Sequence, residues 1–282
     1  MADLSNISTI KSILSKHNFT FSKKLGQNFL IDSSVCPRMA GECCASATTG
    51  VLEIGPGIGI LTCELAKFAN KVVAIEIDTR LKPVLDETLK GLSNVSVLYG
   101  DVLKLDLIEI IKENFAGQDV VVCANLPYYI TSPIIMHLLE NRVPVKSITV
   151  MVQKEAAERL CATVGTRKCG AVTVAVNFYS TAIQLFDVSR DSFMPAPNVD
   201  SAVIRFDVLD EPPIEVADKA KFFRVVKAAF SQRRKTAANS ISSGLSLPKD
   251  VVIDALVKAE INPNARAEEL TMQNFSDICN NI

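Results

Sequence analysis

The sequence predicts an α/β fold: a doubly wound parallel sheet with a small all-helical region after it. Between residues 51 and 152, short apolar segments rich in β-branched residues alternate with segments whose apolar residues recur at helical spacing. This alternation is typical of βαβ units, which build parallel sheets. Beyond residue 210 only helical patterns occur. With 282 residues, 48% of them hydrophobic, the chain has room for one large domain or two.

The elements of the first half follow one another regularly. Apolar residues at helical spacing predict a helix over 5–14, and the polar, basic stretch over 16–28 predicts a loop. Buried strands are then expected at 51–54, 72–75, 95–99, 120–123 and 147–152. Helices are expected between them, at about 59–69, 79–90, 106–114 and 132–140.

The second half is less regular. A helix is expected directly after Gln153, and strands at 183–188 and 199–208, while residues 171–178 fit either a strand or a buried helix. The paired prolines of Asp210-Glu-Pro-Pro cannot continue a strand and indicate a linker. We therefore predict two domains, residues 1–210 and 211–282. Helices of the second are expected at about 215–230, 249–259 and 267–280.

Composition excludes several classes of protein. No run of about 18 apolar residues occurs, and Asp3 and other polar groups interrupt the first twenty residues, so the pattern favours a cytoplasmic protein without membrane attachment. The eight cysteines lack the C-x2-C spacing of a zinc site, and we expect mostly buried thiols and no metal. We also expect a monomer.

Charge is nearly balanced, with 30 basic against 31 acidic residues, so any nucleic-acid binding must be local. The segment Lys221–Ser246 holds six basic residues and no acidic one. Within it Arg233, Arg234 and Lys235 are consecutive, and on a helix three such residues fan over roughly 200°. At least two of them would then face solvent or a partner, so the segment is either an RNA contact or a solvated helix face.

A glycine-rich turn, Gly55-Pro56-Gly57-Ile58-Gly59, follows the first strand of the sheet, and Ile60 breaks the dinucleotide-binding fingerprint G-x-G-x-x-G. Such a backbone still approaches a ligand closely. The second strand ends in Glu76-Ile77-Asp78, where an acid can accept both ribose hydroxyls. The third ends in Gly100-Asp101, where a carboxylate can accept an adenine amine, although either acid alone also fits a helix cap or a solvated turn. Together these strand ends predict an adenosine-containing cofactor.

The fourth strand ends in Asn125-Leu126-Pro127-Tyr128-Tyr129. The amide oxygen of Asn125 and a neighbouring backbone carbonyl offer two acceptors to one NH2 group, and Pro127 stiffens the turn that holds them. Two such hydrogen bonds favour a pyramidal adenine N6 whose lone pair points at a sulfonium methyl, while Tyr128 would stack on a flipped base. The plainer interpretation is a βα turn capped by an asparagine.

The chain resembles the ribosomal RNA adenine N6,N6-dimethyltransferases of the KsgA type, which use S-adenosylmethionine. The matching motifs span nearly the whole chain: Lys24–Leu30, Glu53–Thr62, Glu76 with Asp78, Gly100-Asp101, Asn125–Ile134, Phe193–Ser201 and Ala229–Thr236. The resemblance implies a Rossmann-like S-adenosylmethionine-dependent methyltransferase sheet and a helical rRNA-binding domain. It also implies that the substrate is 16S small-subunit rRNA within a pre-ribosomal small subunit. Two adjacent adenines of that RNA would be the targets.

The resemblance implies a role for each matching residue. Cofactor contacts are implied for Asn28, Leu30, Gly55, Glu76, Asp101 and Asn125. Asn28 and Leu30 would close over the cofactor, with Gly55 beneath its methionine part, Glu76 at the ribose and Asp101 at the adenine. Catalytic roles are implied for Asn125, Leu126, Pro127, Tyr128 and Phe193, the last of which would sandwich the base against Tyr128. RNA contacts are implied for Arg233, Arg234 and Lys235.

The remaining residues give weaker indications of function. No general base appears in the turn Asn125-Leu126-Pro127-Tyr128, called the NLPY turn below. None is needed, because a methylated amine is acidic enough to lose its proton to water. His137 is expected to pack or cap, and His17 either packs or contacts RNA. Cys169 stands where the family often has an aromatic residue, which affects only a packing contact.

Three alternatives stay open. A macrolide-resistance methyltransferase would perform the same chemistry on 23S rRNA. A ribosome-assembly factor would act mainly by binding, although the intact NLPY turn favours retained catalysis. A nicotinamide dehydrogenase is disfavoured by Ile60 and by the lack of a proton-relay residue in that turn.

Overall fold

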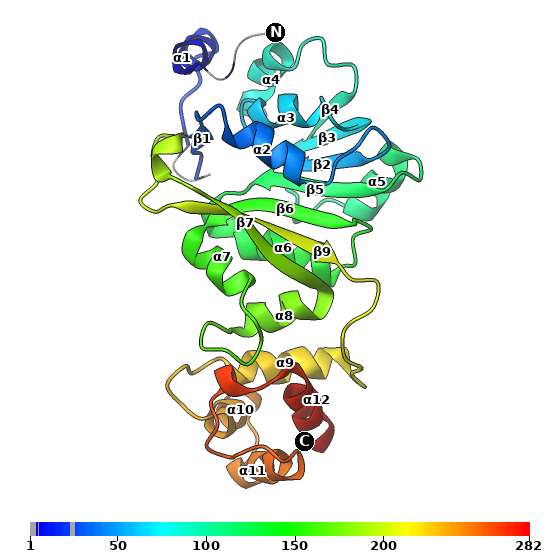
Figure 1. The fold of residues 1–282 in the computed structure, drawn as a ribbon, viewed down its shortest axis with the longest axis vertical. Helices are drawn as coiled ribbons and strands as arrows, with labels where there is room; N and C mark the ends of the chain where they lie inside the picture. Colours follow the sequence, from blue (N-terminus) through cyan, green and yellow to red (C-terminus); the bar gives the residue numbers. More distant parts are fainter. Residues whose placement is uncertain (1–3, 5, 23–25) are drawn as a thin grey trace. The chain divides into compact units, whose positions relative to one another are not determined.

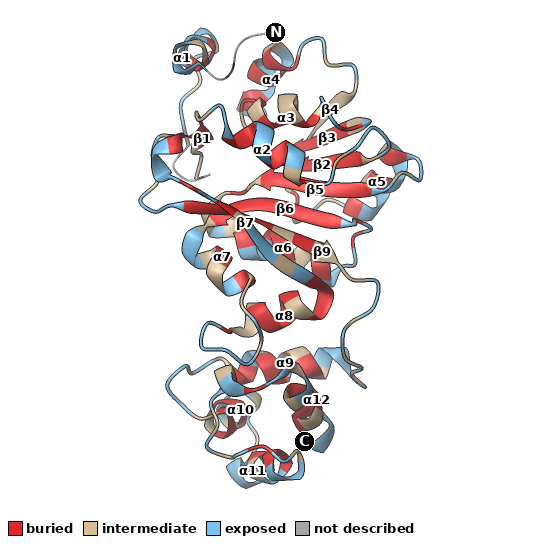
Figure 2. Cartoon of the chain, viewed as in Figure 1, coloured by how far each residue is buried: buried red, intermediate tan, exposed pale blue. Residues whose placement is uncertain are grey.

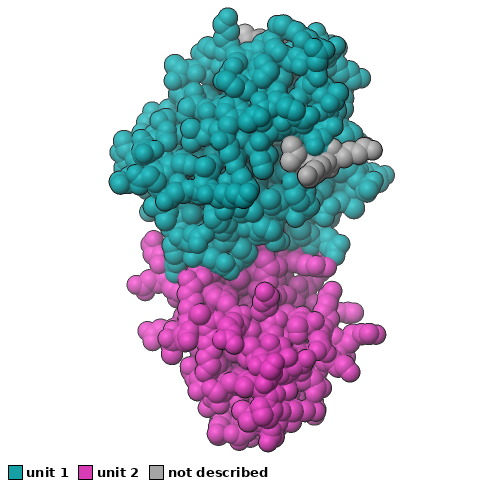
Figure 3. Space-filling model, turned by 180° about the vertical axis from the view of Figure 1, so that it is seen from behind, with its two compact units in different colours: residues 1–157, 183–208 teal, residues 158–182, 209–282 magenta. Residues whose placement is uncertain are grey.

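The computed structural model describes residues 4, 6–22 and 26–282, and the chain divides into two compact units (Figure 3). Unit 1 consists of residues 1–157 and 183–208, and unit 2 of residues 158–182 and 209–282. Among the described residues, no helix has the length and apolar character needed to cross a bilayer.

Unit 1 is built on a mixed sheet with the strand order β4-β3-β2-β5-β6-β9-β7 (Figure 1). The strands are β2 (Gly50–Ile54), β3 (Lys71–Glu76), β4 (Val95–Tyr99), β5 (Val120–Asn125), β6 (Ser147–Gln153), β7 (Ser180–Val188) and β9 (Ser201–Val208). The strands from β2 to β6 pair in parallel, and β9 pairs antiparallel with β6. The predicted α/β class is thereby confirmed.

Helices precede and connect these strands. They are α1 (Ile7–Lys16), α2 (Val35–Glu42), α3 (Ile60–Leu65), the 3-10 turn η2 (Thr79–Leu81) with α4 (Lys82–Thr88), α5 (Leu107–Phe115), η3 (Tyr128–Ile130) with α6 (Thr131–Glu140), and α7 (Lys154–Leu160). Figure 1 shows α2 and α3 in front of the sheet and α6 behind it. The sequence predicted each of these helices except α2.

The core of unit 1 lies against the central strands, which Figure 2 shows buried along their length. Met39 of α2 and Leu65 of α3 pack in one cluster with Val51, Val72 and Val121 of the strands. All five side chains are almost fully buried. Burial on both faces explains why these strands read as continuous apolar runs instead of alternating patterns.

The strand order reverses between β2 and β5. From β2 the chain runs outward through β3 to β4, and then returns to place β5 on the other side of β2. In open α/β sheets the connections on the two sides of this point diverge, and a crevice opens beyond the carboxyl ends of the two strands. The topology therefore marks the ends of β2 and β5 as the place for a ligand.

A second, two-stranded sheet joins segments far apart in sequence. Strand β1 (Phe29–Leu30) pairs antiparallel with β8 (Phe193–Met194), with Leu30 opposite Phe193. The N–H of Ile31 donates to the carbonyl of Ser192 at 2.8 Å, which extends the pairing. The N-terminal loop and the loop after the short η4 turn (Arg190–Ser192) are thus held together.

Unit 2 contains the helices α8 (Ala171–Tyr179), α9 (Lys219–Ala229), α10 (Ala237–Leu245), α11 (Lys249–Lys258) and α12 (Met272–Asn281), with a 3-10 turn η5 (Ala267–Glu269). Phe178 and Tyr179 of α8 contact Phe222 and Phe223 of α9, with ring centroids 5.2 to 5.7 Å apart across the two helices. Residues 171–178 are therefore a buried helix, which settles the alternative left open by sequence. The compact units differ from the predicted division at 210 mainly in residues 158–182, which belong to unit 2.

Candidate active site

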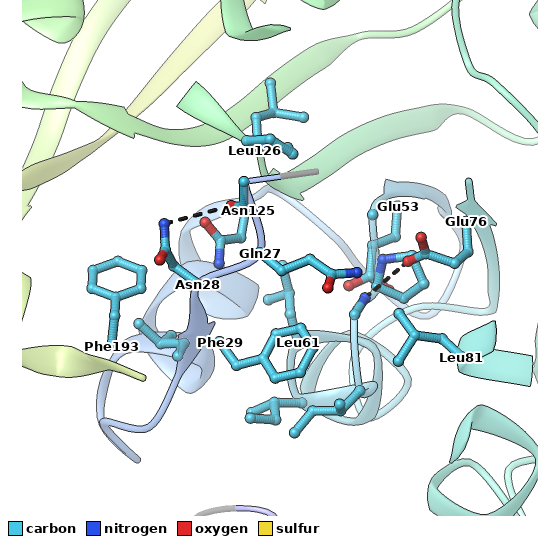
Figure 4. A pocket seen from close by; sticks show the side chains of 18 of the residues that line it. Gln27, Asn28, Phe29, Glu53, Leu61, Glu76, Leu81, Asn125, Leu126 and Phe193 are labelled. Atoms are coloured by element: carbon cyan, nitrogen blue, oxygen red, sulfur yellow. Dashed lines mark hydrogen bonds between the residues drawn. The ribbon is translucent and has the colours of Figure 1, made fainter. Parts of the chain in front are cut away.

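A cavity lies at the carboxyl ends of β2, β3 and β5, where the strand order reverses (Figure 4). Its walls come from the N-terminal loop, the glycine-rich turn, the end of β3, the NLPY turn and β8. The predicted site residues that line it are Asn28, Leu30, Gly55, Glu76, Asn125, Leu126, Pro127, Tyr128 and Phe193. The structure therefore brings together segments that the sequence indicated separately.

The glycines of the turn after β2 have different structural roles. Gly59 precedes α3 with φ of +91°, and a Cβ there would lie 2.8 Å from the Leu89 side chain. Gly55 has φ of +72°, but a Cβ there would meet no atom within 4 Å. Gly59 is thus required for packing, whereas Gly55 leaves open space at the cavity wall.

Glu76, the last residue of β3, presents a carboxylate fixed by backbone donors. Its Oε1 accepts the N–H of Asp78 at 2.8 Å, and its Oε2 accepts the N–H of Gly57 at 3.3 Å. The residue is only 4% exposed, and this burial raises its pKa to about 6 against the lowering effect of those N–H groups. Glu76 is therefore an ionised acceptor at neutral pH, and each of its oxygens has a further lone pair to offer.

Asp78 serves the site indirectly. Its carboxylate accepts two hydrogen bonds from the Arg80 guanidinium, at 2.8 and 2.6 Å, and these hold its pKa below the usual value. The same carboxylate accepts the amide of Gln27 at 2.9 Å. Since Gln27 lines the cavity, Asp78 anchors the N-terminal loop at the carboxyl end of β3.

The NLPY turn begins at Asn125, which ends β5 opposite Met151 of β6. The hydroxyl of Tyr128 is 2.7 Å from the hydroxyl of Ser201, the first residue of β9. The hydroxyl of Thr131 donates to the carbonyl of Pro127 at 3.2 Å. These contacts fix the turn so that Asn125 and Tyr128 both line the cavity.

Phe193 reaches the same cavity from β8 and is only 3% exposed. Its position follows from the pairing of β8 with β1, which sets it opposite Leu30. Figure 4 shows Phe193 on the side of the cavity occupied by Asn28 and away from Glu76. Phe193, expected at the target base, and Glu76, expected at the ribose, thus lie at different ends of the cavity.

Asp101 does not line this cavity. Its Oδ1 accepts the N–H of Leu103 at 3.1 Å, and the Lys104 ammonium is 3.6 Å from its Oδ2. The residue follows β4 at the neighbouring strand end, and its predicted contact with adenine stays a prediction.

Glu53 of β2 lines the cavity and was not among the predicted site residues. It is 1% exposed, and burial raises its pKa to about 8. The signal in the sequence was a carboxylate inside the apolar strand VLEIG, because an isolated acid is rarely buried without a functional or structural partner.

The basic run Arg233-Arg234-Lys235 lies in the loop between α9 and α10, outside the helices expected from sequence, so the alternative of a solvated helix face does not describe it. Helix α9 ends at Ala229, and the hydroxyl of Thr236 caps the start of α10 by accepting the N–H of Asn239. All three basic side chains are exposed. Within the described part of the chain they form no ion pair. Their contact with RNA stays a prediction.

The two histidines lie outside the cavity lining. The Nε2 of His17 lies 2.7 Å from Oε2 of Glu87, and the side chain is 18% exposed, so it is already engaged. His137 contacts the amide of Asn141 at 3.0 Å near the end of α6. Cys169 is buried, as expected of most of the thiols. Lys24 and Leu25, which begin the N-terminal motif, lie outside the described residues.

Comparisons with known proteins identify close relatives. The family model Ribosomal RNA adenine dimethylase matches residues 18–282. The chain is 47% identical to Ribosomal RNA small subunit methyltransferase A of Bacillus mycoides (strain KBAB4) over 284 residues, 99% of this chain and 97% of that protein. Identity to the protein of the same name from Geobacillus sp. (strain WCH70) is 45%, over 99% of this chain and 97% of that protein.

Two solved structures are similar over most of the chain. A dimethyladenosine transferase from Plasmodium falciparum gives a TM-score of 0.72 at 26% identity, over 89% of this chain and 95% of that one. The 23S rRNA methyltransferase ErmE gives a TM-score of 0.67 at 28% identity, over 90% of this chain and 99% of that one. The likeness therefore includes both sheet and helical region.

Proposed function

Because the chain belongs to the ribosomal RNA adenine dimethylase family, we propose that it transfers methyl groups from S-adenosylmethionine to the N6 amines of adenines in 16S small-subunit rRNA. Support for the small subunit as substrate comes from the relatives named Ribosomal RNA small subunit methyltransferase A, to which the chain is 45 to 47% identical. Its identity to the 23S rRNA methyltransferase ErmE is 28%. The observation that carries the proposal is that Asn125 and Tyr128 line the same cavity as Glu76.

The cavity residues fit an adenosine-containing cofactor. Glu76 offers fixed, ionised oxygens to ribose hydroxyls, and the open space beside Gly55 leaves room for a ligand against the backbone. Glu53 adds a buried carboxylate to a lining that, within the described residues, contains no basic side chain. When bound, S-adenosylmethionine supplies an electrophilic methyl group on a positively charged sulfur. Asn28 and Leu30 would close this site from the N-terminal loop.

The protein's contribution to the reaction is positioning. The Asn125 amide oxygen and a backbone carbonyl of the NLPY turn would accept the two N–H groups of the target amine and direct its lone pair toward the methyl donor. Pro127 and the buried Leu126 fix that turn, while Tyr128 and Phe193 would hold the flipped base between their rings. The proton lost after methylation would leave to water, so no side chain is needed as a base.

The exposed Arg233-Arg234-Lys235 loop would contact rRNA phosphates, and we propose residues 211–282 as the rRNA-binding domain. We further propose that the protein acts as a monomer on a pre-ribosomal small subunit in the cytoplasm. In that setting two adjacent adenines would enter the same cavity in turn.

Labelling of purified ribosomal subunits tests the function. Small subunits incubated with radiolabelled S-adenosylmethionine should accept label as N6,N6-dimethyladenine, and large subunits should not. An Asn125→Ala variant should lose the labelling, whereas Asn141→Ala, at the end of α6 and outside the cavity, should keep it. Label on large subunits alone would indicate the 23S type, and tight particle binding without label would indicate an assembly factor.

A further inference from the structure

Glu53 is a buried carboxylate that the proposed positioning mechanism does not use. It lies in the central strand β2, is 1% exposed and lines the cavity on the same side as Glu76 (Figure 4). Neither of its carboxylate oxygens has a hydrogen-bond partner within the described residues. A buried acid with no partner, lining a ligand cavity, indicates that the partner belongs to the ligand.

The surroundings of Glu53 favour its neutral form in the free protein. Burial raises its pKa to about 8, and the charge of Glu76 adds to that rise. The nearby Thr62 hydroxyl opposes the rise, although its oxygen does not meet the geometry of a hydrogen bond with Glu53. The other ionisable groups that face it are thiols: Cys36 on α2, Cys63 on α3 and Cys123 on β5. None of these groups is a cation.

The thiols do not titrate near neutral pH. Burial raises the pKa of Cys36 and that of Cys63, the latter to about 11, while a hydrogen bond with Cys43 raises the pKa of Cys123. Glu76, with a pKa of about 6, is ionised throughout the range above pH 7. Between pH 7 and 8.5, Glu53 is therefore the one group of this cluster whose charge changes.

We propose that Glu53 releases its proton to solvent when a cationic group of the cofactor enters the cavity, so that cofactor binding is coupled to proton release. The lining supports this, because it offers two carboxylates and, within the described residues, no lysine, arginine or histidine to neutralise them. A cation beside a neutral carboxyl group favours its ionised form. The inference rests on the proposed function only for the identity of the ligand.

The ligand carries two candidate cations. S-adenosylmethionine has a sulfonium and an ammonium group, whereas S-adenosylhomocysteine has the ammonium group alone. If the sulfonium is the partner of Glu53, proton release accompanies the methyl donor and not the product. If the ammonium is the partner, both ligands release the proton. Either result supports the coupling, and the comparison identifies the cation.

Calorimetric titration of the full chain measures the coupling directly. The heat of binding at pH 7.5 is compared in phosphate and in Tris, whose ionisation enthalpies differ, for wild type and Glu53→Gln. At half a unit below a pKa of about 8, roughly three quarters of the molecules carry the Glu53 proton. Wild type should therefore release about 0.7 proton more than the variant on binding S-adenosylmethionine. Taking the difference removes protons exchanged by the ligand's own amine.

Two further measurements keep the inference open to refutation. The control is Glu64, a carboxylate on α3 that pairs with Lys67 and does not line the cavity. The Glu64→Gln variant should release as many protons as wild type on binding S-adenosylmethionine. The affinity of wild type for S-adenosylmethionine should rise from pH 7 to 8.5, by up to tenfold for each pKa unit that ligand binding removes from Glu53. This second measurement does not depend on the folding of the Gln variant.

The outcomes separate this inference from the proposed function. If S-adenosylmethionine does not bind wild type at all, the proposed function fails. If it binds with equal proton release in wild type and Glu53→Gln, or with an affinity that is flat across this pH range, the function stands and the coupling is refuted.

Discussion

The cavity of unit 1 and the basic loop of unit 2 are organised in opposite ways. Around the cavity, Glu76, Asp78 and Tyr128 are each held by hydrogen bonds to another segment of unit 1. In the loop, Arg233, Arg234 and Lys235 are exposed and, within the described residues, make no ion pair. A reacting atom must be placed to a fraction of an ångström, whereas a phosphate contact needs mainly charge and reach. The two regions should therefore respond differently to substitution.

The largest effect is expected from Asn125→Ala. Loss of the amide oxygen leaves the target amine without one of its two acceptors, and misplacement of this kind costs on the order of 100-fold in rate. Because the contact matters most in the transition state, cofactor affinity should weaken much less. Single-turnover methylation by saturated enzyme measures the rate, and calorimetry the affinity. A wild-type rate in the variant would contradict the role proposed for the NLPY turn.

Glu76→Ala should act on binding instead of chemistry. Hydrogen bonds to a charged group contribute roughly 1.5–3 kcal/mol, so the dissociation constant for S-adenosylmethionine should rise about 10- to 150-fold. Equilibrium titration of the variant measures this change. Glu109→Ala, an exposed acid on α5, is the matched control and should leave the constant unchanged. An unchanged constant in the Glu76 variant would remove that residue from the site.

Replacing Arg233, Arg234 and Lys235 together by Ala tests the other side of the comparison. Each lost phosphate contact should reduce the slope of log binding constant against log salt concentration by about 0.7 to 0.9 for small-subunit binding. The slope of the triple variant should therefore be smaller by roughly 2 to 3. Its affinity for S-adenosylmethionine should stay normal. Binding to small subunits over a range of salt concentrations provides the measurement.

Lys249 and Lys258 provide the control for that variant. Lys258 already pairs with Asp254 at 2.7 Å, so a double Ala change should flatten the salt slope less. If the triple variant and the wild type have equal slopes, the loop is merely solvated. The RNA contact would then move to the N-terminal loop around Lys23 and Lys24, which lie outside the described residues.

The smallest effect is expected from Ser201→Ala. This change removes the 2.7 Å contact between Ser201 and the Tyr128 hydroxyl but leaves the ring in the cavity wall. One hydrogen bond contributes roughly 0.5–1.5 kcal/mol, so kcat/KM should fall about 2- to 12-fold. Tyr128→Phe should give a similar loss, and the double variant little more, because both changes delete the same contact. Additive losses would show that Ser201 acts elsewhere.

Much of the cavity was predictable because parallel strands place their carboxyl ends at one edge of the sheet. That rule alone brings Gly55, Glu76 and Asn125 together, whatever their separation in sequence. Asp101 follows the same rule yet does not line the cavity, since its carboxylate is used in the turn that follows β4. Strand order tells which edge a residue occupies but not which way its side chain turns.

The unpredicted elements depend on tertiary contacts. Helix α2 contains Pro37 and Gly41, both poor helix formers, and is held by burial against the sheet. Helix α10 is rich in serine, and its Gly244 packs so closely on Ala228 that a Cβ would lie 2.7 Å away. Thr236, three residues before Asn239, was the local signal that a helix begins after the basic run.

The pairing of β1 with β8 has a consequence for how the active site forms. Asp32 and Ser192, joined by a 3.0 Å hydrogen bond beside this pairing, are 160 positions apart in the chain. Closing so long a loop costs entropy before any contact repays it, so such a pairing belongs among the late events of folding. During synthesis, Leu30 leaves the ribosome long before Phe193, and the wall they build together cannot exist until most of the chain has been made. A nascent chain should therefore acquire its sheet before it acquires a finished cavity.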